Sequence, residues 1–583
     1  MTGVLRSRRR RLPSIVAAAG VLSIIPLLGE PVDEPRILVE EAWVGRNVLV
    51  REAGEWERYT LGRSEGGVFL RLQHSADRGI SWSEPEPLAR FFDETGGAVA
   101  TLEDRDGSVH VFLQRRRPGW GPGGPMVDRF IDLWHARSEP GRTDWTEPQL
   151  VFEGYVGHLS KAVQMESGRI VLPFGYWGED RTYGPPYGPH TLITKYSDDG
   201  GTTWKRSASE LTSPVYEGYN GLNYGACEPT IAELGDGRLW MLFRTQTGYL
   251  YESFSRDGSQ WTPARPSRFH ASTGPPELTR LPDGRLMLFW NNAAMPPRVE
   301  GAGVYGGRDA LHAAISEDDG ETWIGFREIY LDPARNETPP RRGDRGTAYP
   351  EGIVDGEDYV YVVSGQARRV LLAIDPDWLY ETGRRSDFAK GLEDWSVFKA
   401  FGPAEGWWRD RVRGAVVAED PDEPALHVRR PDDWDPDGAV WNFPTGHAGS
   451  VSFRLKLNEG FDGVAVALAD RFFDPSDDSG EAHAVFGLRI DGDGRLPGGH
   501  AFSKGEWQTV SLEWDLSLAR CEVVIDGETA VGLSPRNLTR NGINYLRFRS
   551  TAGRRDPEGV LIRDVRAAVS ERKPVTWQGR EGE

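Results

Sequence analysis

The chain has 583 residues, 38% of them hydrophobic and 27% charged, and this balance is that of soluble globular protein rather than of membrane or disordered protein. A chain of this length is too long for one hydrophobic core, so several domains are expected. The net charge of −19 argues against a nucleic-acid-binding protein, which needs a basic surface to follow phosphates. An anionic ligand is not excluded, because a local group of arginines binds one inside an acidic protein.

The N-terminal residues 1–30 have the pattern of an export signal. Arginines are concentrated between Arg6 and Arg11, and an apolar stretch follows from Ile15 to Leu28. This stretch is short for a membrane-spanning helix, and Gly29 is the best candidate for the cleavage position. We therefore expect a secreted or periplasmic protein. It would contact a membrane only if residues 1–30 stay uncleaved as an anchor.

A sequence of about eight residues recurs along the first two thirds of the chain. Ser75–Trp82, Ser197–Trp204 and Ser316–Trp323 share a serine, an aspartate, a glycine and a final tryptophan. Ser255–Trp261 is one residue shorter, and Ser138–Trp145 is a degenerate copy. The copies start 58 to 63 residues apart, which suits one four-stranded propeller blade per repeat.

The repeat has the chemistry of a folded turn, in which aspartate accepts backbone N–H groups, glycine takes a positive φ and tryptophan covers the turn. Strand-like runs lie between the copies, such as 238–244 after Asp236-Gly237 and 285–290 after Asp283-Gly284. The 70 glycines and 21 tryptophans also favour short strands joined by tight turns. Residues 36–382 divided by this period predict six blades, the last without a repeat.

The repeats stop after Asp387, and residues 388–570 contain other strand-like runs. Alternation of apolar and polar residues in 449–457 and 545–549 predicts strands with one buried face, as in a β-sandwich. The predicted fold class is thus all-β, a six-bladed β-propeller followed by a β-sandwich of jelly-roll type, with residues 571–583 as a tail.

No cofactor or metal is predicted. Cys227 and Cys521 fall in different predicted domains and make neither a disulfide framework nor a zinc site. The acidic runs 432–438 and 491–494 have oxygen ligands of the kind that calcium prefers, but solvated turns have the same composition and are commoner.

The repeats are similar to the Asp boxes of sialidases, and on them the chain resembles the sialidase (neuraminidase) superfamily. The resemblance implies a six-bladed propeller whose boxes lie on the face opposite the active site, so Asp77, Asp199 and Asp318 are expected to be structural. The second part resembles concanavalin-like or laminin-G-like domains, which often bind glycans. Because propellers carry many activities, the fold alone does not decide the function.

Sialidases bind the carboxylate of a sugar with three arginines and use a tyrosine nucleophile assisted by a glutamate. The segment 226–244 resembles the family's Glu-Pro segment and implies Glu228 as the base beside the tyrosine and Arg244 as one clamp arginine. Arg308 precedes the box at Ser316 and resembles another clamp arginine. Tyr349, about one blade later, stands where the family has its nucleophile.

Two features depart from the family pattern. The first clamp arginine is best matched by Arg36, with Arg46 as the alternative. The family's general acid is an aspartate, yet none occurs between Arg36 and the first box at Asp77. Glu65 and Asp93 are the candidates to replace it.

Histidines and tyrosines in glycine-rich loops leave a second interpretation open. His135, His158 and His190 lie near such loops, and a polysaccharide lyase uses tyrosine or histidine to abstract the proton next to a uronate carboxylate. The consecutive arginines 115–117 are either contacts for an anionic substrate or a solvated charge run, and the second is commoner.

The interpretation that we prefer is a sialidase-like exo-glycosidase that hydrolyses a terminal acidic sugar, sialic acid or a related one, from a glycan. Tyr349 and Glu228 are its predicted catalytic residues, and Arg244, Arg308 and Arg36 its predicted substrate-binding residues. The alternatives are a lyase acting on uronate glycans and a non-catalytic glycan-binding protein. A pure binding protein has no need of a glutamate beside the tyrosine, and a lyase would release an unsaturated product that absorbs ultraviolet light.

Overall fold

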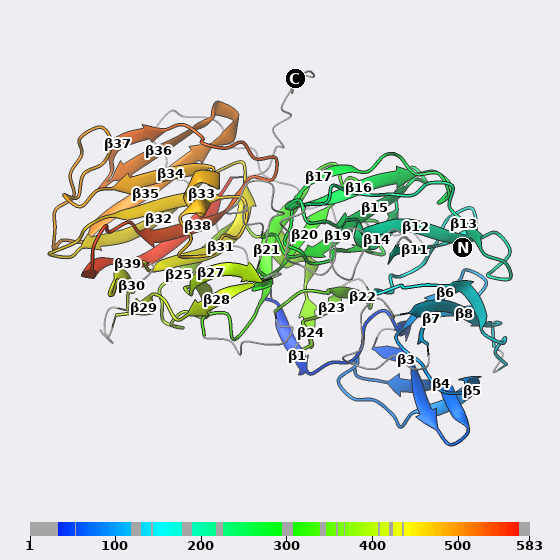
Figure 1. The fold of residues 1–583 in the computed structure, drawn as a ribbon. Helices are drawn as coiled ribbons and strands as arrows, with labels where there is room; N and C mark the ends of the chain where they lie inside the picture. The colour runs from blue at the N-terminus through cyan, green and yellow to red at the C-terminus, as the bar shows by residue number, and fades with distance from the viewer. Residues whose placement is uncertain are drawn as a thin grey trace, which may run out of the picture.

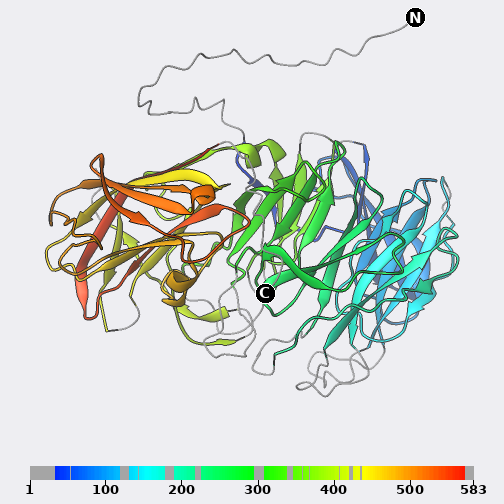
Figure 2. The same cartoon turned by 90° about the horizontal axis from the view of Figure 1, so that it is seen from above.

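A computed structural model describes residues 33–570 except for 53, 118–129, 142–143, 178–188, 217–224, 294–306, 338–345, 357–358, 367, 406–407, 419–423 and 434–435. The predicted export segment and the tail therefore lie outside the described residues, as do parts of the glycine-rich loops around Tyr183 and Tyr187. Two bodies of β-sheet lie side by side in both views, one from blue to green and one from yellow to red (Figures 1 and 2). Among the described residues, no helix has the length and apolarity that crossing a bilayer requires.

The first body consists of six four-stranded antiparallel sheets, as expected for a six-bladed propeller. The first three blades are formed by β2 (Val48–Glu52), β3 (Glu55–Ser64), β4 (Gly67–Ser75) and β5 (Glu86–Phe92); by β6 (Val99–Glu103), β7 (Val109–Arg116), β8 (Ile131–Ser138) and β9 (Gln149–Phe152); and by β10 (Val163–Gln164), β11 (Ile170–Trp177), β12 (His190–Ser197) and β13 (Lys205–Arg206).

The next two blades are formed by β14 (Cys227–Glu233), β15 (Leu239–Arg244), β16 (Tyr249–Ser255) and β17 (Arg265–His270), and by β18 (Glu277–Arg280), β19 (Leu286–Trp290), β20 (Ala310–Ser316) and β21 (Ile324–Leu331). The sixth blade combines β22 (Glu351–Val354), β23 (Val360–Ser364) and β24 (Val370–Ile374) with the N-terminal strand β1 (Arg36–Glu40), which pairs antiparallel with β24. The propeller is thus closed by joining the start of the described chain to its last blade.

The blade strands are apolar on both faces because each sheet packs between two others. Every residue of β15, from Leu239 to Arg244, is buried, and the same holds for β19 and β24. A strand covered on both sides reads as a continuous apolar run, and this is how the runs after Asp236-Gly237 and Asp283-Gly284 appear in the sequence.

The repeated sequence forms the same turn each time. In the copy that starts at Ser197, Asp199 Oδ1 accepts the Thr203 backbone N–H at 2.8 Å and Asp199 Oδ2 accepts the Thr203 hydroxyl at 2.6 Å. The copies at Ser75 and Ser316 repeat these bonds, and in each the tryptophan Nε1 donates to a glycine carbonyl of the turn. The turns follow the third strand of their blades, as Ser316 ends β20.

The second body is a β-sandwich. One sheet contains β25 (Gly383–Ser386), β29 (Val416–Val417), β30 (Leu426–Arg430), β32 (Ala448–Leu457), β35 (Gln508–Asp515), β36 (Arg520–Ile525), β37 (Glu528–Leu533) and β39 (Asp556–Val569). The other contains β26 (Trp395–Ser396), β31 (Gly438–Gly446), β33 (Val464–Ala469), β34 (Phe486–Ile490) and β38 (Ile543–Ser550). Alternate residues of β32 are buried, as its sequence pattern predicts.

Three short helices and one hairpin complete the described structure. The helices are η2 (Pro376–Tyr380), α1 (Ser479–His483) and η3 (Leu516–Leu518). The hairpin pairs β27 (Lys399–Glu405) with β28 (Trp408–Val412) and is labelled near the propeller strand β21 in Figure 1. The sandwich contacts the fifth blade through buried polar groups, since Tyr545 donates to Glu328 Oε1 at 2.7 Å and the Asn442 side chain bonds the backbone at both Phe326 and Glu328.

Candidate active site

Three of the predicted site residues meet directly. The Tyr349 hydroxyl donates to Glu228 Oε1 at 2.8 Å, and Arg244 Nη1 donates to Glu228 Oε2 at 2.7 Å. The Arg308 guanidinium lies 5.3 Å from the centre of the Tyr349 ring. Four residues that are far apart in sequence therefore form one continuous chain of contacts, with Glu228 bonded on both of its oxygens.

The strand ends explain how these residues meet. Arg244 is the last residue of β15 and is paired with Cys227 at the start of β14, where a bulge interrupts the register between Cys227 and Pro229. Glu228 occupies this bulge with a backbone φ of 53°, a value that residues other than glycine rarely adopt. Tyr349, two residues before the innermost strand β22, has a φ of 62°.

A cavity of about 450 Å³ opens beside Tyr349. Arg46, His158, Glu351 and Arg369 line it together with Tyr349, and they come from the first, third and sixth blades. A smaller cavity of about 130 Å³ is also lined by His158, and its lining includes Tyr155, His190 and Glu228. The two cavities share Tyr349 and His158, so the phenol faces both.

Of the two candidates for the first clamp arginine, Arg46 lines the cavity beside Tyr349 and Arg36 does not. Arg36 lies on β1, the outermost strand of the sixth blade, where its guanidinium stacks 5.8 Å over the Tyr359 ring. Tyr349 precedes the innermost strand of that blade, so Arg36 and Tyr349 lie at opposite edges of the sheet, and the expectation that Arg36 lies at the site is corrected.

Arg46 also determines the tautomer and the protonation state of His158. Its Nη1 lies 2.9 Å from His158 Nε2, and since a guanidinium only donates, Nε2 accepts and the ring proton resides on Nδ1. Burial first, and then the charge of Arg46, lower the pKa of His158 to about 3. Burial likewise lowers the pKa of His190 to about 4. Both imidazoles are therefore neutral at physiological pH.

The arginines hold the carboxylates of the site ionised. Burial alone raises the pKa of Glu228, but the charge of Arg244 and its hydrogen bond outweigh the burial, and the pKa falls to about 2. Glu351 behaves in the same way, because Arg46 and Arg369 outweigh its burial and lower its pKa to about 2. Glu351 Oε1 lies 2.9 Å from Arg369 Nη2 and 3.4 Å from Arg46 Nη2.

Tyr349 keeps its proton in the resting site. Burial raises its pKa, the negative charge of Glu228 raises it further, and Arg244 and Arg308 only partly oppose these effects. Proton transfer from a weakly acidic phenol to a weakly basic carboxylate is unfavourable by itself. A transfer of this proton to Glu228 is therefore favourable only if the phenol oxygen forms another bond at the same time.

Three other candidate residues do not line the two cavities. His135 is bonded to His110 at 3.0 Å and to the box tryptophan Trp204 at 3.4 Å, so it supports a repeat turn. The side chain of Asp93 is 78% exposed and pairs with Arg90, and Glu65 is exposed in a hairpin turn, so neither faces the cavity as a substitute acid. Glu351 is not among the site residues identified from the sequence. Its place two residues after Tyr349 is a signal that could have identified it.

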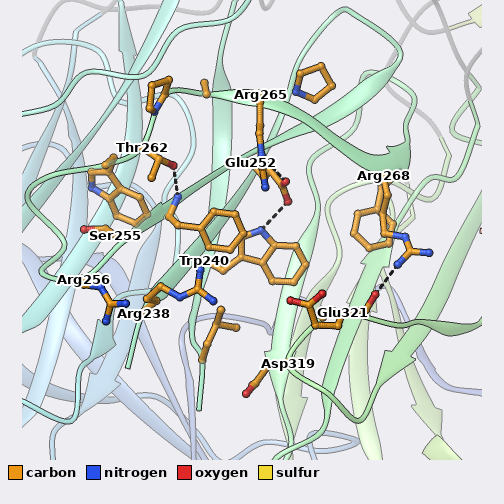
Figure 3. A pocket seen from close by; sticks show the side chains of 18 of the residues that line it. Arg238, Trp240, Glu252, Ser255, Arg256, Thr262, Arg265, Arg268, Asp319 and Glu321 are labelled. Carbon is orange, nitrogen blue, oxygen red and sulfur yellow. Dashed lines mark hydrogen bonds and ion pairs between the residues drawn. The ribbon is translucent and has the colours of Figure 1, made fainter. Parts of the chain in front are cut away.

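Another groove, of about 1280 Å³, lies at the opposite end of the strands, and its lining includes the box residues Ser255 and Asp319 (Figure 3). Two of its arginines are held by neighbouring lining residues. Arg265 Nε bonds Glu252 at 2.9 Å, and Arg268 donates to the Glu321 carbonyl at 2.8 Å. The candidate active site is at the two cavities that share Tyr349 and His158, next to the contacts among the tyrosine, the glutamate and the arginines.

A BNR repeat-like domain is matched over residues 53–362, more than half of the chain. The chain belongs to this family. No curated protein gives a match. Among solved structures, this BNR repeat-like protein is similar to Trypanosoma rangeli sialidase, with 12% identity and a TM-score of 0.36 over 91% of this chain and 92% of that one. It is also similar to a protein of unknown function from Dyadobacter fermentans, with 18% identity and a TM-score of 0.41 over 59% of this chain and 100% of that one.

Proposed function

We propose that this BNR repeat-like protein is an exported exo-glycosidase that hydrolyses a terminal acidic sugar, sialic acid or a close relative, from a glycan. The observation that carries the proposal is the chain Tyr349–Glu228–Arg244 with Arg308 against the tyrosine ring. A buried glutamate that bonds both a phenol and an arginine is the arrangement that a tyrosine nucleophile requires.

The sequence of bond changes follows from these contacts. The Tyr349 oxygen forms a bond to the anomeric carbon while its proton passes to Glu228. The bond from that carbon to the aglycone oxygen breaks, and this oxygen takes a proton from solvent water as it leaves. A water molecule then attacks the anomeric carbon and gives one proton back to the solvent, the bond to Tyr349 breaks, and the phenol recovers its proton from Glu228. Arg46, Arg244 and Arg308 supply the positive charge that binds the sugar carboxylate and lowers the cost of bringing an anion to the nucleophile.

A second candidate is a lyase that acts on uronate glycans. Two neutral histidines, His158 and His190, share the two cavities with Tyr349, and the carboxylates Glu228 and Glu351 are both held ionised. A neutral imidazole or a phenolate removes a proton next to a carboxylate that an arginine neutralises, without any carboxylic acid. The substrate is acidic in both proposals, but the products differ.

The deciding experiment is the release of free sialic acid from mixed sialosides by the purified protein and by Tyr349→Phe. We expect turnover by the wild type and a loss of at least about 10³-fold in the variant, because the nucleophile is removed. Tyr359→Phe is the matched control, since this half-buried tyrosine bonds Asp33 at 3.3 Å and lines neither cavity.

Absence of sialic acid release by a folded wild type contradicts the sialidase proposal. The same proteins are then incubated with uronate-containing glycans while ultraviolet absorbance is followed. A rise in absorbance that Tyr349→Phe or His190→Ala abolishes supports the lyase, and no product from either class of glycan contradicts both activities.

A further inference from the structure

The arginine beside the tyrosine ring is followed in the chain by an aspartate that faces the sandwich. Arg308 and Asp309 are 3% and 2% exposed, and they immediately precede β20. Arg411 of β28 donates from Nη1 to Asp309 Oδ1 at 2.7 Å and from Nη2 to Asp309 Oδ2 at 3.3 Å. This two-point contact joins the hairpin β27–β28 to the segment that carries Arg308.

The position of Arg411 is itself closely defined. Its guanidinium stacks 3.8 Å over the ring of the buried Phe398, and its Nη1 also lies 3.2 Å from the Arg335 carbonyl. A fully buried ion pair adds little net stability, because the cost of removing both charges from water offsets their attraction. A forked guanidinium–carboxylate pair does fix direction and distance, so its main effect is on geometry.

The backbone of Arg308 also supports the turn that carries Tyr349. The Arg308 carbonyl accepts the Thr347 backbone N–H at 2.7 Å and the Thr347 hydroxyl at 3.0 Å, two residues before Tyr349. The Arg308 side chain donates to the Thr273 carbonyl at 2.7 Å. A movement of the backbone at Arg308 therefore shifts both a guanidinium of the site and the support of the Tyr349 turn.

We propose that Arg411 is a positioning residue of the active site, acting through Asp309 on Arg308 and Tyr349. The hairpin β27–β28, from the C-terminal part of the chain, then completes the proposed site of the propeller, so this part is more than an attached glycan-binding module. Its effect on turnover rests on the proposed function, whereas its effect on the geometry of Arg308 does not.

The kinetic test is a double-mutant cycle with Arg411→Met and Arg308→Lys on an acidic glycoside. Arg411→Met is expected to raise KM about tenfold with a smaller change in kcat, because a displaced guanidinium binds the substrate carboxylate less well. In the Arg308→Lys background the same change is expected to cost less than about twofold, since both substitutions act on one contact. Equal effects in both backgrounds overturn the proposal.

Two further variants separate positioning from folding. Arg411→Met alone removes the guanidinium that pairs with the buried Asp309, so the pair is also replaced as Asp309→Leu with Arg411→Met, which removes both charges together. This protein is expected to fold and to show the same rise in KM. Asn541→Ala is the matched control, because it removes the sandwich contact to Arg268 at 2.8 Å on the box side and should leave KM unchanged.

The geometric test needs no substrate. In a crystal structure of the Asp309→Leu, Arg411→Met protein, we expect the Arg308 guanidinium to leave its bonds to Thr273 and Gln366, with a changed distance to the Tyr349 ring. Arg308 in its wild-type place overturns the proposal. A wild type that turns over no acidic glycan contradicts the proposed function only, and the crystallographic comparison still decides the positioning role.

Discussion

Glu228 and Tyr349 adopt left-handed backbone conformations, with φ values of 53° and 62°. A residue other than glycine pays of order 1–3 kcal/mol for a sparsely populated conformation of this kind, and such residues cluster at functional sites. Here both members of the hydrogen-bonded pair carry the strain. In Glu228 it accompanies the bulge that interrupts the β14 ladder, and in Tyr349 it occurs just before β22, so that the two side chains meet.

The ionised glutamates predict how stability depends on pH. Arg46 and Arg369 lower the pKa of Glu351 from 4.5 to about 2, so Glu351 contributes stability that is fully present above about pH 4.5 and is lost as the pH falls toward 2. Glu351→Gln is expected to reduce the fall in unfolding free energy between these pH values. Denaturant unfolding at a series of pH values measures this fall in unfolding free energy.

The control is Glu252→Gln. Burial raises the pKa of Glu252, which reverses the sign, so its removal should not flatten the acid side of the curve. If wild type and Glu351→Gln lose stability equally between pH 4.5 and 2, the arginines do not hold Glu351 ionised.

At the scale of single elements, the repeat turn separates stability from catalysis. Asp199 accepts three hydrogen bonds within its turn, from Ser197 and Thr203, and lies at the end of β12 away from Tyr349. Its neighbour Asp198 makes exposed ion pairs with Arg169 and Lys205, which are worth little in water.

Asp199→Ala is therefore expected to lower the free energy of unfolding by about 1–3 kcal/mol and to leave kcat/KM unchanged, because the turn loses its acceptors while the cavity is untouched. Asp198→Ala removes the same charge one residue away and should cost less than about 1 kcal/mol. Thermal unfolding together with turnover measures both. A loss of activity in a stable Asp199→Ala protein would place the box in the active site.

At the scale of the whole molecule, a buried acid lies at the contact between propeller and sandwich. The carboxyl of Glu328 accepts the Tyr545 hydroxyl at 2.7 Å, and Tyr545 Oη lies 2.5 Å from His312 Nε2. Burial raises the pKa of Glu328 to about 7, and the bond from Tyr545 only partly opposes this. The folded protein therefore holds a proton that the unfolded chain releases above about pH 4.5.

Stability is thus lost as the pH rises from about 4.5 to 7, the opposite sign to Glu351. Glu328→Gln keeps an acceptor for Tyr545 and removes the titration, so it is expected to flatten the decline over this range. Guanidinium unfolding from pH 4.5 to 8, followed by tryptophan fluorescence, measures the decline in unfolding free energy. An unchanged slope in Glu328→Gln would show that this carboxyl is ionised in the folded protein.

The sequence by itself was sufficient for the features that are local. The repeat turns form from their own serine, aspartate, glycine and tryptophan, so their spacing predicted the six blades, and the alternation in 449–457 predicted a sandwich strand. Glu228, Arg244, Arg308 and Tyr349 were identified by resemblance of short segments, and the structure brings them together.

Tertiary structure decided whatever depends on the edge of a sheet or on a distant partner. Arg36 and Arg46 are ten residues apart, but pairing of β1 with β24 sends the first to the outside of the sixth blade and leaves the second at the cavity. No local sequence pattern predicts the pairing of β1 with β24, because the two strands lie at opposite ends of the propeller sequence. Arg411 is likewise a surface-like arginine in the sequence, and only the docked sandwich buries it against Asp309. Burial and pairing also neutralise His158 and ionise Glu351, since a pKa is determined by surroundings that the chain assembles only when it folds.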